Sequence, residues 1–103
     1  MRLTTDQCHL ILATVRRHVG VPHRVLLYGS RLDDQARGGD VDLLIESAAP
    51  MPTLQRARIK NELEDRLHLP IDLIAIQSGR EATPFQVIAL AQAVPLDLSQ
   101  HGH

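Results

Sequence analysis

Aromatic side chains are scarce in this sequence. They make up 2% of its 103 residues, as Tyr28 and Phe85, and tryptophan is missing. Proteins that bind single-stranded nucleic acid usually stack bases on aromatic rings, so the composition argues against that function. The net charge of −1 argues the same way, because proteins that bind the phosphate backbone are usually basic. We therefore expect no DNA partner.

Cysteine and long apolar runs are scarce as well. Cys8 is alone, which excludes a disulfide within the chain and gives no sign of an oxidising compartment. The apolar run from Leu10 to Ala13 is too short for the core of a signal peptide, and no segment approaches the length of a membrane span. We expect a cytoplasmic protein without a membrane partner, folded as a single domain over residues 1–103 with a modest core.

The most informative stretch contains a glycine-serine pair and two aspartates. An apolar run from Val25 to Leu27, typical of a buried strand, is followed by Tyr28 and then by Gly29-Ser30. After nine intervening residues comes Asp40-x-Asp42, which opens a second apolar run. Alternate side chains of a strand share a face, so Asp40 and Asp42 point the same way with Cα atoms roughly 6–7 Å apart. Both carboxylates can therefore converge on a hard cation.

A third strand adds another carboxylate. Asp72 is the one charge in the run Ile71–Ile76, which follows a helical segment over Thr53–Leu67. If the first two strands are antiparallel, Gly29-Ser30 lies beside Asp40 and Asp42, and a right-handed crossover through the helix makes the third strand parallel to the second. Three carboxylates and a glycine-serine turn then meet at one end of a sheet, which predicts a metal-and-phosphate site. Read alone, Asp72 has an alternative interpretation as an edge-strand residue that faces water, but beside the other carboxylates the catalytic interpretation is favoured.

These residues resemble a known family. The Gly29-Ser30 pair, the spacing to Asp40-x-Asp42 and the later lone Asp72 are similar to the DNA polymerase β-type nucleotidyltransferases. The small size is similar to the minimal nucleotidyltransferases (MNT), many of which are antitoxins paired with HEPN-domain ribonuclease toxins. The resemblance covers about residues 25–98. It departs at residues 32–35, where many members have alanine after the arginine and a glycine three residues further on.

The resemblance implies a fold, a reaction and a partner. The fold would be α/β (α+β), with a small mixed sheet and elements in the order α-β-α-β-α-β-α. The reaction would move a nucleoside monophosphate, AMP from ATP, onto a hydroxyl, and the acceptor would be a tyrosine of a HEPN toxin. Asp40, Asp42 and Asp72 would hold two Mg²⁺ ions, with Asp72 also accepting the attacking proton. Gly29 and Ser30 would bind the β- and γ-phosphates, helped by Arg31.

Other interpretations compete at several of these positions. Ser30 has capping-box spacing to Asp33, so it could simply cap a short helix over residues 30–36, although a helix N-terminus also suits a triphosphate. Asp33 and Asp34 are neighbours on that helix and diverge by about 100°, so we leave them out of the metal site. Arg37 is interpreted as a surface residue, and nothing in the sequence locates Arg80.

The remaining segments read as helices with recognisable ends. Thr4 and Gln7 have capping-box spacing at the start of a helix that ends near Gly20, and its Arg16, Arg17 and His18 are interpreted as solvated charges favoured by the helix dipole. Thr83, Pro84 and Gln86 open a last helix that runs to about Ala93. Its expected packing surface consists of Val87, Ile88, Leu90, Ala91 and Val94. Residues 95–98 could add a short edge strand.

Three functions stay open at this point. The first is the nucleotidyltransferase that modifies a HEPN partner. The second is an antitoxin that neutralises its partner by binding alone, although clustered like charges have no use in a pure binding module. The third is nucleotidyl transfer to a small molecule such as an aminoglycoside. This function is less favoured, because we expect no additional domain. The acceptor, the nucleobase preference and the choice between homo- and hetero-oligomer are not marked by any motif.

Overall fold

The structure, a computed structural model, describes residues 3–28 and 41–96. Its helices and strands are α1 (Thr5–His18), β1 (His23–Tyr28), β2 (Val41–Ser47), α2 (Thr53–Leu67), β3 (Ile71–Gln77), α3 (Pro84–Gln92) and β4 (Val94–Pro95). The predicted α+β class with a small mixed sheet is confirmed. The helix expected over residues 30–36 lies outside the described ranges. The short edge strand expected over residues 95–98 is found one residue earlier, as β4 over Val94–Pro95, and residues 97 and 98 lie outside the described ranges.

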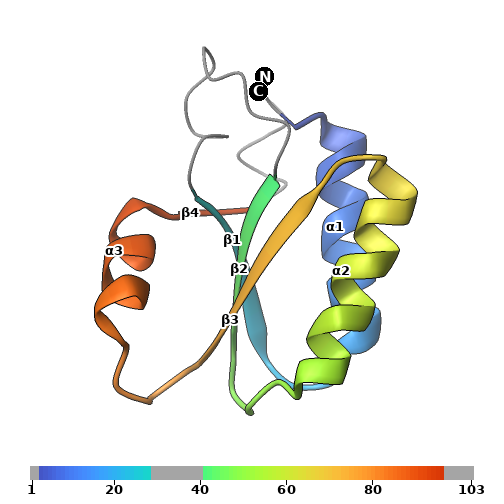
Figure 1. The fold of residues 1–103 in the computed structure, drawn as a ribbon. Helices are drawn as coiled ribbons and strands as arrows, with labels where there is room; N and C mark the ends of the chain where they lie inside the picture. Colours follow the sequence, from blue (N-terminus) through green and yellow to red (C-terminus); the bar gives the residue numbers. More distant parts are fainter. Residues whose placement is uncertain (1–2, 29–40, 97–103) are drawn as a thin grey trace.

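The strands form one sheet in the order β3-β2-β1-β4. β1 is antiparallel to β2 and to β4, whereas β2 and β3 are parallel and joined by the α2 crossover. Figure 1 shows α1 and α2 side by side on one face of the sheet and α3 on the other. The β1–β2 and β2–β3 pairings are the ones that the sequence predicted, and they bring the end of β1 to the starts of β2 and β3.

The sheet has an apolar core on each face. Under α1 and α2, alternate strand residues such as Val41, Leu43 and Ile45 pack against helix residues such as Ile11 and Ile59, all of them fully buried. Under α3 the core is smaller. Its four buried residues are Leu26, Leu44, Ile76 and Ala89. Four partly buried residues pack against them: Tyr28, Ile74, Leu90 and Ala93. The strand period of two therefore decides which side chains face which helices.

The helix ends follow the capping signals. The Thr4 and Thr83 side chains accept hydrogen bonds from the backbone N–H groups of Gln7 and Gln86, and both glutamine side chains bond back. α2 ends at His68, whose left-handed backbone (φ 58°) turns the chain toward β3. Both predicted capping boxes are thus confirmed. None of the helices in residues 3–28 and 41–96 is long and apolar enough to span a bilayer.

The predicted packing surface of α3 is correct at Leu90, which packs against the small core, but wrong for most of its other residues. The structure buries Ala89 against the sheet, whereas Phe85, Val87 and Ile88 are 61%, 54% and 59% exposed. Apolar residues surround this helix on most sides, so their spacing does not select one face. The small Ala89 side chain faces the sheet and leaves the larger side chains in solvent. The result is an exposed apolar surface, Phe85, Val87 and Ile88, which we call the α3 apolar surface.

Glu62 of α2 joins the two helices on the opposite face. Its carboxylate lies 3.0 Å from Nε2 of His18, pairs with Arg17, and lies 3.2 Å from Nε of Arg66. The prediction that Arg17 and His18 are merely solvated is therefore wrong. Hydrogen bonds from His18 and Arg17 are the main causes that lower the pKa of Glu62 to about 2.

We expect Glu62 to make folding stability depend on acid. A carboxyl group whose folded pKa is lowered contributes stability above its unfolded pKa and loses it as the pH falls toward the folded value. The gap in melting temperature between wild type and Glu62→Gln should therefore be present at pH 7 and shrink as the pH falls from about 4.5 toward about 2. Glu81→Gln, at an exposed glutamate far along the chain, is the matched control. An equal gap at pH 7 and pH 3 would contradict this role.

Candidate active site

Tyr28, Asp42 and Asp72 form a row across three strands. Tyr28 is paired with Asp42 in the antiparallel ladder, and Asp42 is paired with Asp72 in the parallel ladder. Neighbouring strands lie about 4.8 Å apart, and paired residues project from the same face of a sheet. The three side chains therefore stand next to one another on the face that carries α3. The structure brings Asp42 and Asp72 together, as the strand pairing predicted.

Several hydrogen bonds fix the strand starts that carry the carboxylates. The Val41 N–H donates to the Pro70 carbonyl at 2.8 Å, which sets β2 against the start of β3. The Ile71 N–H donates to Oε2 of Glu64 at 2.9 Å, so α2 holds the residue before Asp72. This backbone bond, followed by the bond from Lys60, lowers the pKa of Glu64. A charged Glu64 thus keeps the start of β3 in place at neutral pH.

The row is open to solvent at one end and half-buried at the other. Asp72 is exposed, while Asp42 and Tyr28 are half-buried. Burial, and then the negative charges of Asp42 and Asp72, raise the pKa of Tyr28 to about 12. Both carboxylates thus disfavour the charged form of the same phenol, in agreement with their neighbouring positions in the ladders.

We expect Tyr28 to report on these two charges. It is the only tyrosine, and no tryptophan is present, so tyrosinate absorbance follows Tyr28 alone. Asp42→Asn should lower the pKa of Tyr28 from about 12 because one repelling charge is lost, but burial should keep it above the ordinary value. Absorbance titration of both proteins checks this. An unchanged Tyr28 pKa would show that the Asp42 carboxylate does not face the phenol.

The donor set fits a hard divalent cation. Two carboxylates on neighbouring strands, one of them exposed, supply the oxygen ligands that Mg²⁺ prefers. Asp40, the third predicted ligand, precedes β2 and lies outside the described residues, as do Gly29, Ser30 and Arg31. Among residues 3–28 and 41–96, no three histidine, cysteine, aspartate or glutamate side chains gather around one point. The roles of these four residues therefore stay predictions.

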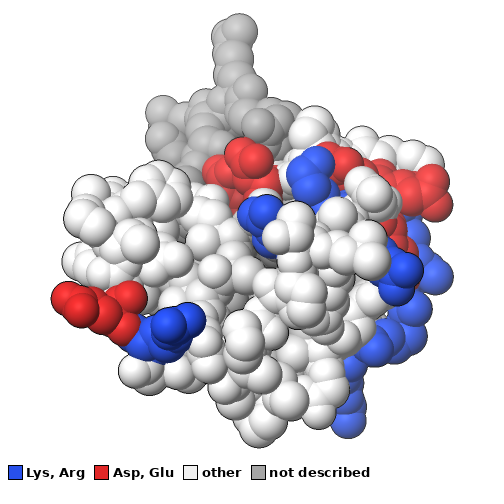
Figure 2. Space-filling model, turned by 60° about the horizontal axis from the view of Figure 1, so that its bottom comes forward, with Lys and Arg blue, Asp and Glu red and all other residues white. Residues whose placement is uncertain are grey.

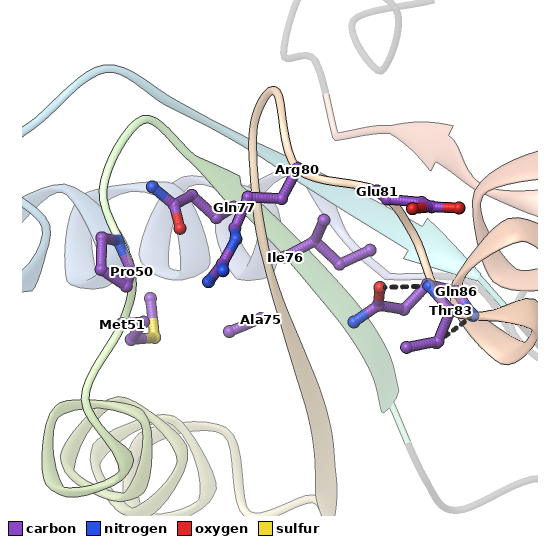
Figure 3. Close-up of a pocket in the computed structure, with 9 residues that line it drawn as sticks. All are labelled: Pro50, Met51, Ala75, Ile76, Gln77, Arg80, Glu81, Thr83 and Gln86. Atoms are coloured by element: carbon purple, nitrogen blue, oxygen red, sulfur yellow. Dashed lines mark hydrogen bonds between the residues drawn. The ribbon is translucent and has the colours of Figure 1, made fainter.

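Arg80 lies at the opposite end of the sheet from the carboxylates. It lines an open pocket of about 450 Å³ together with Met51, Gln77 and Gln86, as Figure 3 shows. Asp72 stands at the start of β3 and Gln77 at its end, so a rise of about 3.3 Å per residue separates them by roughly 17 Å. Arg80 is thus placed away from the candidate site.

Two groups of site residues were missed by sequence reasoning. Tyr28 shares the face of Asp42, and its position directly before Gly29-Ser30 could have signalled this. Arg56 and Lys60 of α2 line an open groove together with Asp72. No local pattern shows that groove, because it depends on how α2 packs beside β3.

The family follows from a comparison with known protein families. A family model described as polymerase beta, nucleotidyltransferase matches residues 11–94, which include Asp42 and Asp72. The chain belongs to this nucleotidyltransferase family. No curated protein sequence matches this chain significantly.

Solved structures share the fold of this nucleotidyltransferase. A chain from a Shewanella oneidensis complex of tri-AMPylated HEPN toxin with MNT antitoxin is 18% identical, covers 97% of this chain and 76% of that chain, and has a TM-score of 0.72. A toxin-antitoxin structure with AMP-PNP is 20% identical, with coverages of 92% and 73% and a TM-score of 0.71. A protein assigned as a minimal nucleotidyltransferase is 26% identical, with coverages of 90% and 96% and a TM-score of 0.63.

Proposed function

We propose that this nucleotidyltransferase transfers AMP from ATP onto a hydroxyl of a HEPN-type toxin, a tyrosine hydroxyl by resemblance, and thereby acts as an antitoxin. The observation that carries the proposal is the pairing of Asp42 with Asp72 across β2 and β3 in a chain of this family. Two structural relatives add support, since one is a complex with a tri-AMPylated HEPN toxin and the other holds AMP-PNP.

The chain's own residues divide the work of the reaction. Asp42, with Asp40, would hold Mg²⁺ against the triphosphate, and Asp72 would complete a second site. Such ions polarise the α-phosphate, favour ionisation of the attacking hydroxyl and neutralise the leaving pyrophosphate. Asp72 is exposed and so accessible to an acceptor, which suits it to take the hydroxyl proton. Gly29, Ser30 and Arg31 would hold the β- and γ-phosphates.

A protein acceptor fits the surface better than a small molecule. The α3 apolar surface exposes three large side chains, and α3 has no charged residue. The side of the molecule that carries α3, on the left in Figure 2, is mostly uncharged apart from an acidic and a basic group at its lower edge. Exposed apolar patches on soluble proteins mark interaction surfaces. Leu90 of α3 and Ala93 at its C-cap pack against the same small core as Tyr28, so this helix borders the carboxylate row.

The second candidate is an antitoxin that acts by binding alone. The α3 apolar surface would serve that function equally well. The adjacent Asp42 and Asp72 favour the enzyme, because neighbouring like charges repel and a binding surface gains nothing from them.

Labelled ATP separates these functions. The chain is incubated with Mg²⁺ and a HEPN-type toxin, which we expect the neighbouring gene to encode and which we call the partner toxin, using ATP labelled at either the α- or the γ-phosphate. We expect the partner toxin to acquire label from the α-phosphate only, and EDTA to prevent it. Label from the γ-phosphate would indicate a kinase. Inhibition of the partner toxin without any label would favour the antitoxin that only binds.

Ser30→Ala separates phosphate binding from helix capping. If Ser30 binds phosphate, the variant should reduce the MgATP-induced rise in melting temperature severalfold. Loss of a helix cap by itself should lower the free energy of unfolding of the nucleotide-free protein by about 1 kcal/mol. Thermal melts with and without MgATP measure both effects. If only the melting temperature of the nucleotide-free protein falls, Ser30 is a cap and no phosphate ligand.

A further inference from the structure

A basic groove adjoins Asp72 on the outer edge of the sheet. It is an open hollow of about 240 Å³ between α2 and β3, lined by Thr53, Arg56, Ala57, Lys60, Asp72 and Leu73. Arg56 is exposed and forms no ion pair within the ranges that the structure describes, whereas Lys60 is bonded to Glu64 at 3.1 Å. In the view of Figure 2, basic atoms lie beside an acidic group near the upper middle of the molecule. The groove thus joins a cation that has no ion-pair partner among the described residues to the residue that supplies a proposed catalytic carboxylate.

The position of the groove decides which reactant it can reach. Gly29 and Ser30, the proposed phosphate ligands, follow directly after Tyr28, at the end of β1. Asp72 lies on β3, on the far side of β2 from β1, and β3 is an edge strand. The groove lies beyond Asp72 on that edge. It therefore lies on the side of the carboxylate row opposite β1, the strand after which the proposed phosphate ligands follow in the sequence, and a group of the acceptor bound there would lie beside Asp72.

Building on the proposed function, we infer that Arg56, supported by Lys60, binds an anionic group of the acceptor protein and so positions the acceptor hydroxyl against Asp72. A guanidinium makes paired, charge-assisted hydrogen bonds to carboxylates and to phosphates. Two sources on the acceptor carry such oxygens: an acidic side chain near the hydroxyl, and the phosphodiester of an AMP already attached. The second source requires that transfer can repeat on one acceptor.

The test compares Arg56→Gln with Arg58→Gln. Both arginines are exposed on α2, and both changes remove one positive charge, but Arg58 does not line the groove. Transfer from MgATP to the partner toxin is followed by intact mass, with the first and the later additions counted separately. The melting temperatures with and without MgATP are recorded for each variant, since loss of an acceptor contact should change neither.

We expect Arg56→Gln to raise the KM for the partner toxin about tenfold, which is the effect of losing one charge-assisted contact. The kcat and the KM for ATP should change little. A rise already in the first transfer identifies an acidic side chain of the acceptor. Loss confined to later transfers identifies the attached phosphodiester. If Arg56→Gln matches Arg58→Gln in every transfer, the inference is wrong although the proposed function stands. No transfer by the wild type would overturn both.

Discussion

Asp42→Asn is expected to abolish AMP transfer, with a loss of at least about a thousandfold. Asparagine keeps the shape of the side chain and one oxygen, but it removes the charge that would hold Mg²⁺ against the triphosphate. The variant should therefore also lose the rise in melting temperature that MgATP gives the wild type, because that ligand stabilises by binding the folded state. Transfer assays and thermal melts at millimolar MgATP measure both losses.

The same variant should be more stable than the wild type when EDTA removes metal. Asp42 and Asp72 are neighbours in the parallel ladder, so substitution relieves repulsion between two carboxylates. At an effective dielectric of about 20 the gain is on the order of 1 kcal/mol, or roughly 4–8 °C for a chain of this length, and salt should reduce it. A less stable variant in EDTA would mean that Asp42 is needed as a structural hydrogen-bond acceptor.

Asp72→Asn should separate chemistry from nucleotide binding. We expect transfer to fall by about 10²–10⁴-fold, the usual contribution of a general base. The MgATP-induced rise in melting temperature should largely persist, because Asp40 and Asp42 would still hold the ion that accompanies the triphosphate. Asp65→Asn, an exposed aspartate on α2, is the charge-matched control. Equal loss of MgATP stabilisation in Asp42→Asn and Asp72→Asn would show that the two carboxylates do not have separate roles.

Much of the fold could be predicted from local patterns in the sequence. The bounds of α2 could be predicted from the proline-containing connections on either side of its helical pattern. Both capping boxes could be predicted from threonine and glutamine at the spacing that satisfies free N–H groups. The neighbourhood of Asp42 and Asp72 followed from strand alternation and from the handedness of the crossover. These rules depend on local sequence and on short connections, and they correctly predicted that the end of β1 lies beside the starts of β2 and β3.

Contacts between distant segments could not be predicted in the same way. Glu62 pairs with Arg17 and His18 across more than 40 residues, and nothing local distinguishes it from the other acidic residues of α2. Spacing on α3 did not select a face, because apolar residues lie around most of the helix and the buried one is the small Ala89. The groove beside Asp72 depends on the placement of α2 against an edge strand. Long-range packing, which sequence periodicity does not encode, determined each of these features.

The most direct test of the central claim follows the partner toxin's ribonuclease activity and intact mass in the same samples. The toxin is incubated with the chain, ATP and Mg²⁺, and aliquots are freed of the chain before each assay. We expect toxin activity to fall in proportion to the fraction that has gained AMP, and to stay low after the chain is removed. A toxin that is inhibited at unchanged mass, and that recovers when the chain is removed, would contradict nucleotidyl transfer as the function.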